Sequence, residues 1–233
     1  MRNYATLLII AFMALCACSE SKFNDKNIEL KALNIAEELD SANIAVFYKW
    51  GIGHRGDADI FIKYSDDTNA TIYSYSCFYY KNSDTIKLTV RNFENFKQDF
   101  ACDIVMDTSD YYLVEILKYN TSLRVSGVDK NGHDKIFIES PLKKIFKAND
   151  PFETFKTLSD RKDSLGISGV SYRADIGNFI QFYLSSEYIL TYLPDNGHLN
   201  PAFKNVWLET FATGRTIKKN WNLRKLDTPL EEE

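Results

Sequence analysis

Four ionisable side chains lie close together at residues 54–59 of the chain. They are His54, Arg55, Asp57 and Asp59. Asp57 and Asp59 are two residues apart, so on a strand they face the same side and could share a proton or a hard cation. The alternative is a charged turn in which Arg55 neutralises Asp57. We take these four residues as the candidate polar site.

The preceding residues match the dinucleotide-binding pattern Gly-x-Gly-x-x-Gly at positions 51–56. That pattern holds a pyrophosphate where a helix follows, because the amides at the helix N-terminus receive the negative charge. Here Asp57 follows the last glycine, and an alternating strand pattern begins at Ile60. We therefore interpret residues 51–56 as a glycine-rich hairpin loop and expect no nucleotide to bind.

Other chemical patterns in the chain are incomplete. His54, His133 and His198 have no second ligand at i+2 or i+4, so the sequence predicts no zinc pair. Ser168 lacks the last glycine of a nucleophile elbow, because Val170 stands in its place. We expect no metal and no cofactor, and the sequence favours a binding protein over an enzyme.

The N-terminus combines a positive charge with a short apolar segment. Arg2 is followed by residues 5–14, which are apolar except for one threonine, and then by Leu15-Cys16-Ala17-Cys18-Ser19. About 10–14 apolar residues are too few to span a bilayer as a helix, but they suit a secretory signal. The five residues from Leu15 to Ser19 resemble a bacterial lipobox.

This resemblance implies that residues 1–17 are a lipoprotein signal peptide and that Cys18 is lipidated. In the Gram-negative pattern, Ser19 after the modified cysteine directs the protein to the outer membrane, on its periplasmic face or on the cell surface. Each acyl CH₂ buried in the bilayer contributes about 0.8 kcal/mol to the anchor. Residues 18–27 then comprise the lipidated cysteine and a polar tether.

Two cysteines lie beyond the signal peptide, Cys77 and Cys102. An oxidising compartment permits a disulfide between them, which would contribute roughly 3–3.5 kcal/mol in the chain-entropy model. Two buried free thiols are the alternative. Neither cysteine has the neighbouring basic charge that produces a reactive thiolate.

Composition places the chain among ordinary globular proteins. It has 233 residues, of which 45% are hydrophobic and 26% charged, so a disordered chain is excluded. The net charge of -4 provides no field to gather nucleic acid. Aromatic residues, at 14% of the chain, favour a large amount of β-sheet.

Apolar periodicity predicts a helix followed by a run of strands. Apolar residues recur at helical spacing from Ile28 to Leu39. A short helix is the interpretation of residues 94–106, and Asn131-Gly132 predicts a tight hairpin turn. Alternating patterns predict strands at 44–50, 60–64, 71–80, 86–90, 111–119, 123–125 and 136–138.

Prolines organise the second half of the chain. Ser140-Pro141, Asp150-Pro151 and Asn200-Pro201 each place a capping side chain before a proline and predict helix starts. Further strands are predicted at 167–172, 178–184, 188–193 and 221–226, with an apolar helical stripe at 203–211. This order indicates an antiparallel α+β fold, with one or more sheets packed against several short helices.

The globular region is predicted at residues 28–226, followed by a loose acidic tail at 227–233. A weak internal similarity relates residues 55–65 to residues 173–182. It supports the hypothesis of two related hairpin-rich halves with a boundary near residues 140–165. Chance similarity between two strands is the alternative.

Five basic residues surround Trp221. Such a segment could lie on anionic lipid or bind an acidic partner, and a solvated hairpin is the alternative. The basic residues are Arg215, Lys218, Lys219, Arg224 and Lys225.

The sequence as a whole favours a lipid-anchored protein of the cell envelope that acts as a binding module. An inhibitor or immunity-like protein and an accessory scaffold are both consistent with it, with a protein or a glycan as partner. The alternative is an envelope hydrolase that uses the carboxylates around Asp57 and Asp59.

Overall fold

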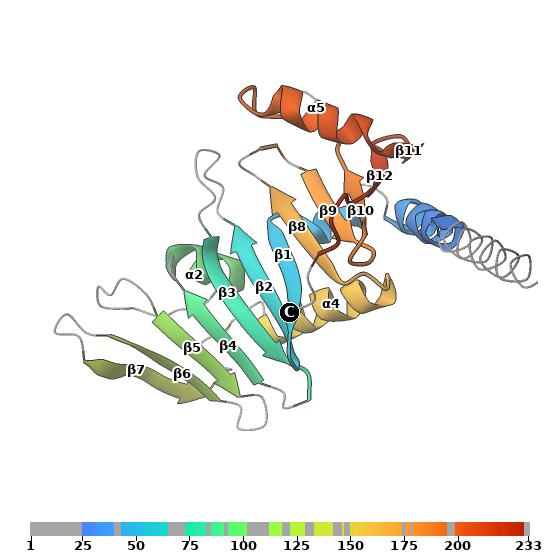
Figure 1. Cartoon of the computed structure of the whole chain (residues 1–233). Helices are drawn as coiled ribbons and strands as arrows, with labels where there is room; N and C mark the ends of the chain where they lie inside the picture. The colour runs from blue at the N-terminus through green and yellow to red at the C-terminus, as the bar shows by residue number, and fades with distance from the viewer. Residues whose placement is uncertain are drawn as a thin grey trace, which may run out of the picture.

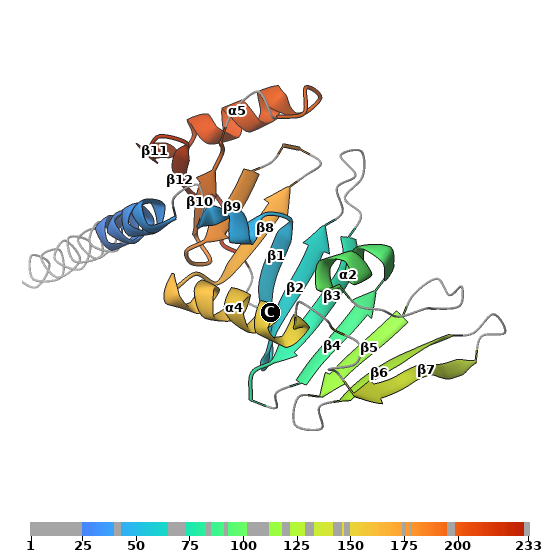
Figure 2. The ribbon, with the colours of Figure 1, turned by 180° about the vertical axis from the view of Figure 1, so that it is seen from behind.

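The computed structural model describes residues 25–39, 43–64, 73–82, 85–90, 93–101, 112–117, 122–128, 133–141, 146, 150–173, 176–177, 179–194 and 199–230. Within these ranges, twelve strands form one antiparallel sheet. The N-terminal helix (residues 25–38), the 3₁₀ helix η1 (Ile44–Phe47), α2 (Phe93–Phe100) and α4 (Pro151–Ser164) are grouped on one side of it (Figures 1 and 2). The predicted α+β class is therefore confirmed.

The sheet is built from consecutive antiparallel hairpins. Its spatial order is β11-β12-β10-β9-β8-β1-β2-β3-β4-β5-β6-β7. In chain order the strands are β1 (Trp50–Arg55), β2 (Ala58–Tyr64), β3 (Tyr73–Tyr80), β4 (Thr85–Val90), β5 (Tyr112–Leu117), β6 (Ser122–Val128), β7 (Asp134–Pro141), β8 (Gly169–Arg173), β9 (Phe179–Tyr183), β10 (Tyr188–Tyr192), β11 (Arg215–Lys218) and β12 (Trp221–Lys225).

One seam joins the N-terminal run of strands to the C-terminal run. Strand β1 pairs with β8, where Ile52 is the register partner of Val170. Gly169 is needed at this seam, because a Cβ atom there would lie 2.7 Å from the carbonyl oxygen of Ile52. The sheet thus continues without a break across the boundary that the sequence suggested near residues 140–165.

The N-terminal helix buries the apolar stripe that the sequence predicted. Ala32, Ile35 and Leu39 are buried against the core. The helix already includes residues 25–27, which the sequence analysis assigned to the tether. Asp25 accepts a hydrogen bond from the hydroxyl of Tyr188 in β10, so this end of the helix is tied to the sheet.

The core beneath α4 is largely aromatic. Phe155 lies in contact with Trp50 of β1, Phe61 of β2 and Phe100 of α2, with ring centroids 5.9, 5.3 and 5.9 Å away. The predicted start of α4 is confirmed, since the Asp150 side chain accepts a hydrogen bond of 2.9 Å from the backbone N–H of Phe152. These contacts fix the position of α4 over the sheet.

Three local predictions before residue 150 are wrong. Residues 44–47 form η1 instead of a strand, because Ile44 and Phe47 are both buried at the three-residue spacing of a 3₁₀ helix. Pro141 ends the edge strand β7 and does not start a helix; an edge position tolerates a residue without an N–H. Gly51 and Gly53 lie within β1 and not in a loop.

Most of the remaining strand predictions are confirmed to within a few residues. Residues 94–106, interpreted as a short helix, contain most of α2. Strands β6 and β7 pair as the predicted antiparallel hairpin, although its turn at residues 129–132 lies outside the described residues.

A second, smaller core lies under α5 (Lys204–Ala212). Phe179 of β9 contacts the rings of Trp207 and Phe211 at 4.7 and 6.3 Å between centroids. The side chain of Asn200 accepts a hydrogen bond of 3.0 Å from the N–H of Ala202, but it caps a turn and not a helix. The helix start predicted at Pro201 is wrong, because α5 begins at Lys204 without a side-chain cap. Helix α5 itself has no buried residue, and it crosses one end of the sheet (Figure 1).

Candidate functional site

The β1–β2 hairpin places the four predicted residues in two different settings. His54 is the register partner of Asp59, one on each strand. Asp57 lies in the turn with Gly56, whose φ of 61° is the left-handed conformation that glycine adopts readily. The turn therefore separates Asp57 from Asp59, and the two carboxylates do not share one side of a strand.

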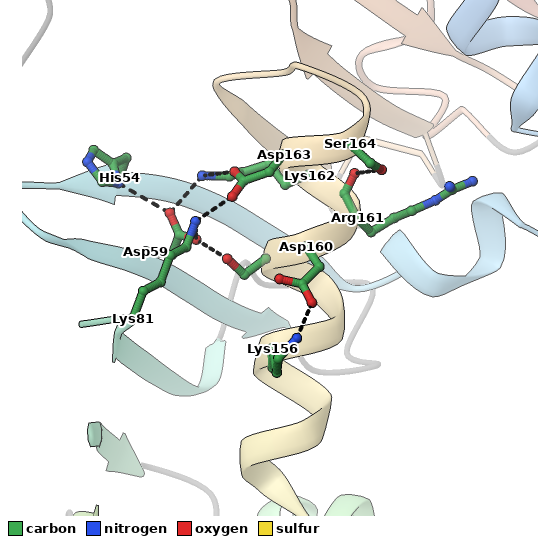
Figure 3. Close-up of polar contacts among 10 residues, drawn as sticks. His54, Asp59, Lys81, Lys156, Asp160, Arg161, Lys162, Asp163 and Ser164 are labelled. Atoms are coloured by element: carbon green, nitrogen blue, oxygen red, sulfur yellow. Dashed lines mark hydrogen bonds and ion pairs between the residues drawn. The ribbon is translucent and has the colours of Figure 1, made fainter. Parts of the chain in front are cut away.

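Asp59 is fully buried and is the centre of a polar cluster (Figure 3). Its Oδ1 accepts hydrogen bonds from Lys162 Nζ at 2.6 Å and from His54 Nδ1 at 3.2 Å. Its Oδ2 accepts one from Ser159 Oγ at 2.5 Å and lies 3.0 Å from Lys81 Nζ. Each carboxylate oxygen thus has two donors, which is close to its capacity.

A second carboxylate completes the cluster at its outer edge. Lys81 Nζ, at the end of β3, lies 2.6 Å from Asp163 Oδ2 and so bridges Asp163 to Asp59. Asp163 also lies 3.5 Å from Lys162 Nζ. We call this set the Asp59 cluster; its members are His54, Asp59, Lys81, Ser159, Lys162 and Asp163.

Electrostatics hold Asp59 in its ionised form. Burial alone would raise the pKa of Asp59, but hydrogen bonds from Lys162, Ser159 and Lys81, together with the charge of Lys162, lower it to about 2. An ionised carboxylate only accepts hydrogen bonds, so His54 must carry its proton on Nδ1. Asp59 is therefore a fixed negative charge and a poor proton acceptor.

The Asp59 cluster ties helix α4 to two hairpin ends. Ser159, Lys162 and Asp163 come from α4, while His54 and Asp59 come from the β1–β2 hairpin and Lys81 follows β3 (Figure 3). With a neutral His54, the two positive charges of the lysines equal the two negative charges of the aspartates, so the cluster has no net charge. The arrangement is that of a structural clamp, in which a buried charge is stabilised by close partners of opposite sign.

The exposed part of the candidate site lies just beyond this clamp. Arg55, Gly56 and Asp57 are all exposed, and we call them the hairpin tip. The His54 side chain, at the base of the tip, is 56% exposed. Within the described part of the chain, no ion pair joins Arg55 to Asp57, so the alternative in which Arg55 neutralises Asp57 is not seen.

Sequence reasoning found Asp59 but missed its partners on α4. A usable signal was present, because Phe152, Phe155, Ser159 and Lys162 recur at helical spacing and all four are buried. A lysine on the buried face of a helix needs a partner of opposite charge. The sequence did not show which carboxylate supplies it.

The other candidate residues lie elsewhere. Cys77 is a fully buried free thiol in β3, and burial raises its pKa well above the ordinary value, which makes it unreactive. Cys18, Cys102 and His198 lie outside the described residues. His133 is exposed. The residues after Gly56 form strand β2, as predicted, and so the glycine pattern does not lead into a helix.

The described residues hold no candidate metal site and no candidate membrane-spanning helix. No group of three His, Cys, Asp or Glu side chains within these ranges is placed to hold a metal ion. None of the described helices has both the length and the apolar composition that a membrane crossing requires. Comparisons with protein-family models, with curated proteins and with solved structures found no match.

Proposed function

We propose that this chain is a lipid-anchored protein of the cell envelope, held at the outer membrane through Cys18, that binds a protein or glycan through its hairpin tip. The observation that carries the binding proposal is the contrast within one hairpin. Arg55 and Asp57 are exposed at the turn, whereas Asp59, two residues further along the chain, is fully buried and held by four donors.

Such a clamp makes the tip a preorganised recognition element. Binding residues are often found on loops that a rigid scaffold positions, because an ordered loop loses less conformational entropy on binding. His54 and Asp59 fix the two strands at the base of the turn, and Lys162 fixes Asp59 to α4. The tip therefore offers one positive and one negative side chain from a constrained backbone, as an inhibitor, an immunity-like protein or an accessory scaffold requires.

The same geometry argues against the hydrolase hypothesis. Acid–base catalysis by two carboxylates requires one that gains or loses a proton near the working pH. Asp59 has a pKa of about 2, and its oxygens are occupied by four donors. Asp57 lies in the turn, and the Ser159 hydroxyl is fully buried and donates its hydrogen bond to Asp59, a carboxylate too weakly basic to take the proton of a nucleophile.

We also propose that the two halves of the sheet derive from related hairpins. Support comes from the similar segments at 55–65 and 173–182, which belong to the adjacent hairpins β1–β2 and β8–β9. A helix precedes each hairpin, at residues 25–38 and at α4. Ile52 and Val170 are register partners, and they occupy equivalent positions in the two similar segments. Ile52 lies three residues before Arg55, and Val170 lies three residues before Arg173.

Replacing Cys18 with alanine should abolish lipidation. Cells that produce the full chain and are grown with a clickable fatty acid should label the wild type and not Cys18→Ala. The matched control is Cys16→Ala, which changes the neighbouring cysteine and should remain labelled. Labelling of Cys18→Ala, or its loss in Cys16→Ala alone, contradicts the proposed anchor.

A photo-crosslinking phenylalanine at position 57 should capture the partner. In producing cells we expect irradiation to give a discrete adduct, because Asp57 is exposed in the turn. The control is the same residue at position 87, an exposed site on β4, which should give no such adduct. Arg55→Ala in the position-57 variant should weaken the adduct several-fold. An adduct pattern identical at positions 57 and 87 contradicts the proposed binding role of the tip.

A further inference from the structure

Basic residues are concentrated at the end of the sheet formed by α5, β11 and β12. Residues 200–225 contain six Lys or Arg and one acidic residue, Glu209, so their formal charge is +5. The whole chain has a net charge of -4, so the remaining residues together carry -9. We call residues 200–225 the basic end. Such a separation of charge indicates an anionic partner for this end.

Some of the basic side chains are used within the fold. Arg215 forms an ion pair with Glu29, and Lys218 Nζ donates a hydrogen bond of 2.7 Å to the carbonyl oxygen of Ala36. Lys204 and Lys219 are exposed, and neither has an ion-pair partner among the residues that the structure describes. These two lysines are therefore the side chains best placed to meet an external anion.

The basic end also exposes apolar side chains. Phe203 is 43% exposed and Val206 is 61% exposed, one at the start of α5 and one in its first turn. Trp221, which the sequence suggested as an interfacial aromatic, is instead buried against Phe182 and Tyr192. The apolar contact surface therefore belongs to α5 and not to the hairpin that follows it.

The N-terminal helix lies beside the basic end. A hollow of about 330 Å³ is lined by both elements, with Lys26 and Leu30 on one side and Arg215 and Ile217 on the other. Leu30 is itself exposed. The proposed lipid site, Cys18, is seven residues before Asp25, and seven residues reach at most about 25 Å. An acylated Cys18 would thus bring the bilayer within reach of this end.

The hairpin tip lies at the other end of the sheet. In both views α5 and β11 are at the top of the molecule, while the turn between β1 and β2 is at the bottom (Figures 1 and 2). A membrane at the basic end therefore leaves the hairpin tip facing away from the bilayer.

We propose that the basic end contacts an anionic lipid surface, with Lys204 and Lys219 at the headgroups and Phe203 and Val206 at the acyl boundary. This inference rests on the proposed lipid anchor, because the anchor is what places a bilayer beside this end. The contact supplies a second attachment that fixes the orientation of the anchored protein. The partner is the phosphate-bearing headgroup layer.

Vesicle co-sedimentation tests this contact without the acyl chains. All contacts described above lie within residues 25–230, so a chain of residues 19–233 contains every residue that makes them and lacks the lipidated cysteine. It should bind vesicles of phosphatidylethanolamine and phosphatidylglycerol, and binding should weaken with added salt. Vesicles of phosphatidylethanolamine and phosphatidylcholine should bind it much less.

Charge reversal locates the contact. Lys204→Glu/Lys219→Glu should reduce the partition onto anionic vesicles by about thirty-fold or more, since each basic residue contributes on the order of a fivefold change. Lys87→Glu/Lys135→Glu makes the same change of charge at two exposed positions outside the basic end and the hairpin tip, and it should bind as the wild type does. Phe203→Ser/Val206→Ser should weaken binding while leaving its salt dependence intact.

Three outcomes overturn the contact: equal binding to both kinds of vesicle, no binding to either, or equal losses in the two charge-reversal variants. A lack of vesicle binding would leave an acidic macromolecule as the partner of this end. Vesicle binding and fatty-acid labelling are separate readouts. A wild-type chain that takes no fatty-acid label but binds anionic vesicles overturns the anchor alone. A labelled wild-type chain whose unlipidated form does not bind vesicles overturns the basic-end contact alone.

Discussion

Asp59→Asn is expected to lower the free energy of unfolding by about 3–5 kcal/mol, because it removes one partner of a buried ion pair. The substitution keeps the shape of the side chain and removes its charge. Lys162, whose side chain is only 7% exposed, then loses its close counterion at 2.6 Å and keeps only Asp163, which is exposed and lies 3.5 Å away. The measurement is chemical denaturation at neutral pH, with Asp57→Asn as the control. Asp57 is exposed, so its substitution should change stability by about 0.5 kcal/mol or less.

A second substitution separates the charge from the packing. Lys162→Met removes the positive charge that Asp59→Asn leaves without its close counterion. The double variant Asp59→Asn/Lys162→Met should therefore lose less unfolding free energy than the two single variants lose in sum. If Asp59→Asn proves as stable as Asp57→Asn, the Asp59 cluster is not a clamp. The argument for a preorganised hairpin tip would then fail with it.

Acid provides an independent check on the same group. The folded-state pKa of Asp59 is lowered to about 2, whereas the unfolded value is about 3.9. The stabilisation from its ionised form is therefore fully present above about pH 4, and it is lost as the pH falls through about 2. Asp59→Asn has no such group, so the stability difference between wild type and variant should shrink over this range, by about 2 kcal/mol.

Local sequence patterns predicted most of the fold. The Asp150-Pro151 cap and the alternating strands are set by neighbours a few residues apart, and they were assigned correctly. The strand predicted at residues 44–50 is wrong at its start. Ile44 and Phe47 fit the three-residue period of a 3₁₀ helix, while the alternating apolar residues of the same segment fit a strand equally well. The choice between them depends on burial against distant elements, such as the edge-to-face contact of Phe47 with Phe182.

The candidate site was predictable only in part. His54 and Asp59 are five residues apart, and their proximity could be inferred from the hairpin. Lys162 is 103 residues from Asp59, so their contact depends on the packing of α4 over the β1–β2 hairpin. The burial of Asp59 also explains why Asp57 and Asp59 differ in role. One lies in the turn, and the other is the second residue of a strand beneath α4.

Phe155→Ala is expected to destabilise the protein by about 3–5 kcal/mol, the usual range for a large side chain removed from a packed core. Phe155 is fully buried and contacts rings from β1, β2 and α2. Its loss leaves a cavity that these neighbours fill only partly. Phe203→Ala makes the same change at an exposed position of the basic end and should have an effect of about 0.5 kcal/mol or less. Equal losses for the two variants would contradict the position of α4.

The coupling between Phe155 and Asp59 gives the sharper result. Ser159 and Lys162 follow Phe155 on the same helix by four and seven residues, so both the aromatic core and the Asp59 cluster hold α4 on the sheet. Once either contact is lost, α4 is held less firmly, and the other contact contributes less to stability. Phe155→Ala/Asp59→Asn should therefore be less destabilised than the sum of the single variants, by roughly 0.5–3 kcal/mol. Strict additivity would mean that the two contacts act separately, and that the hairpin tip is held independently of the aromatic core.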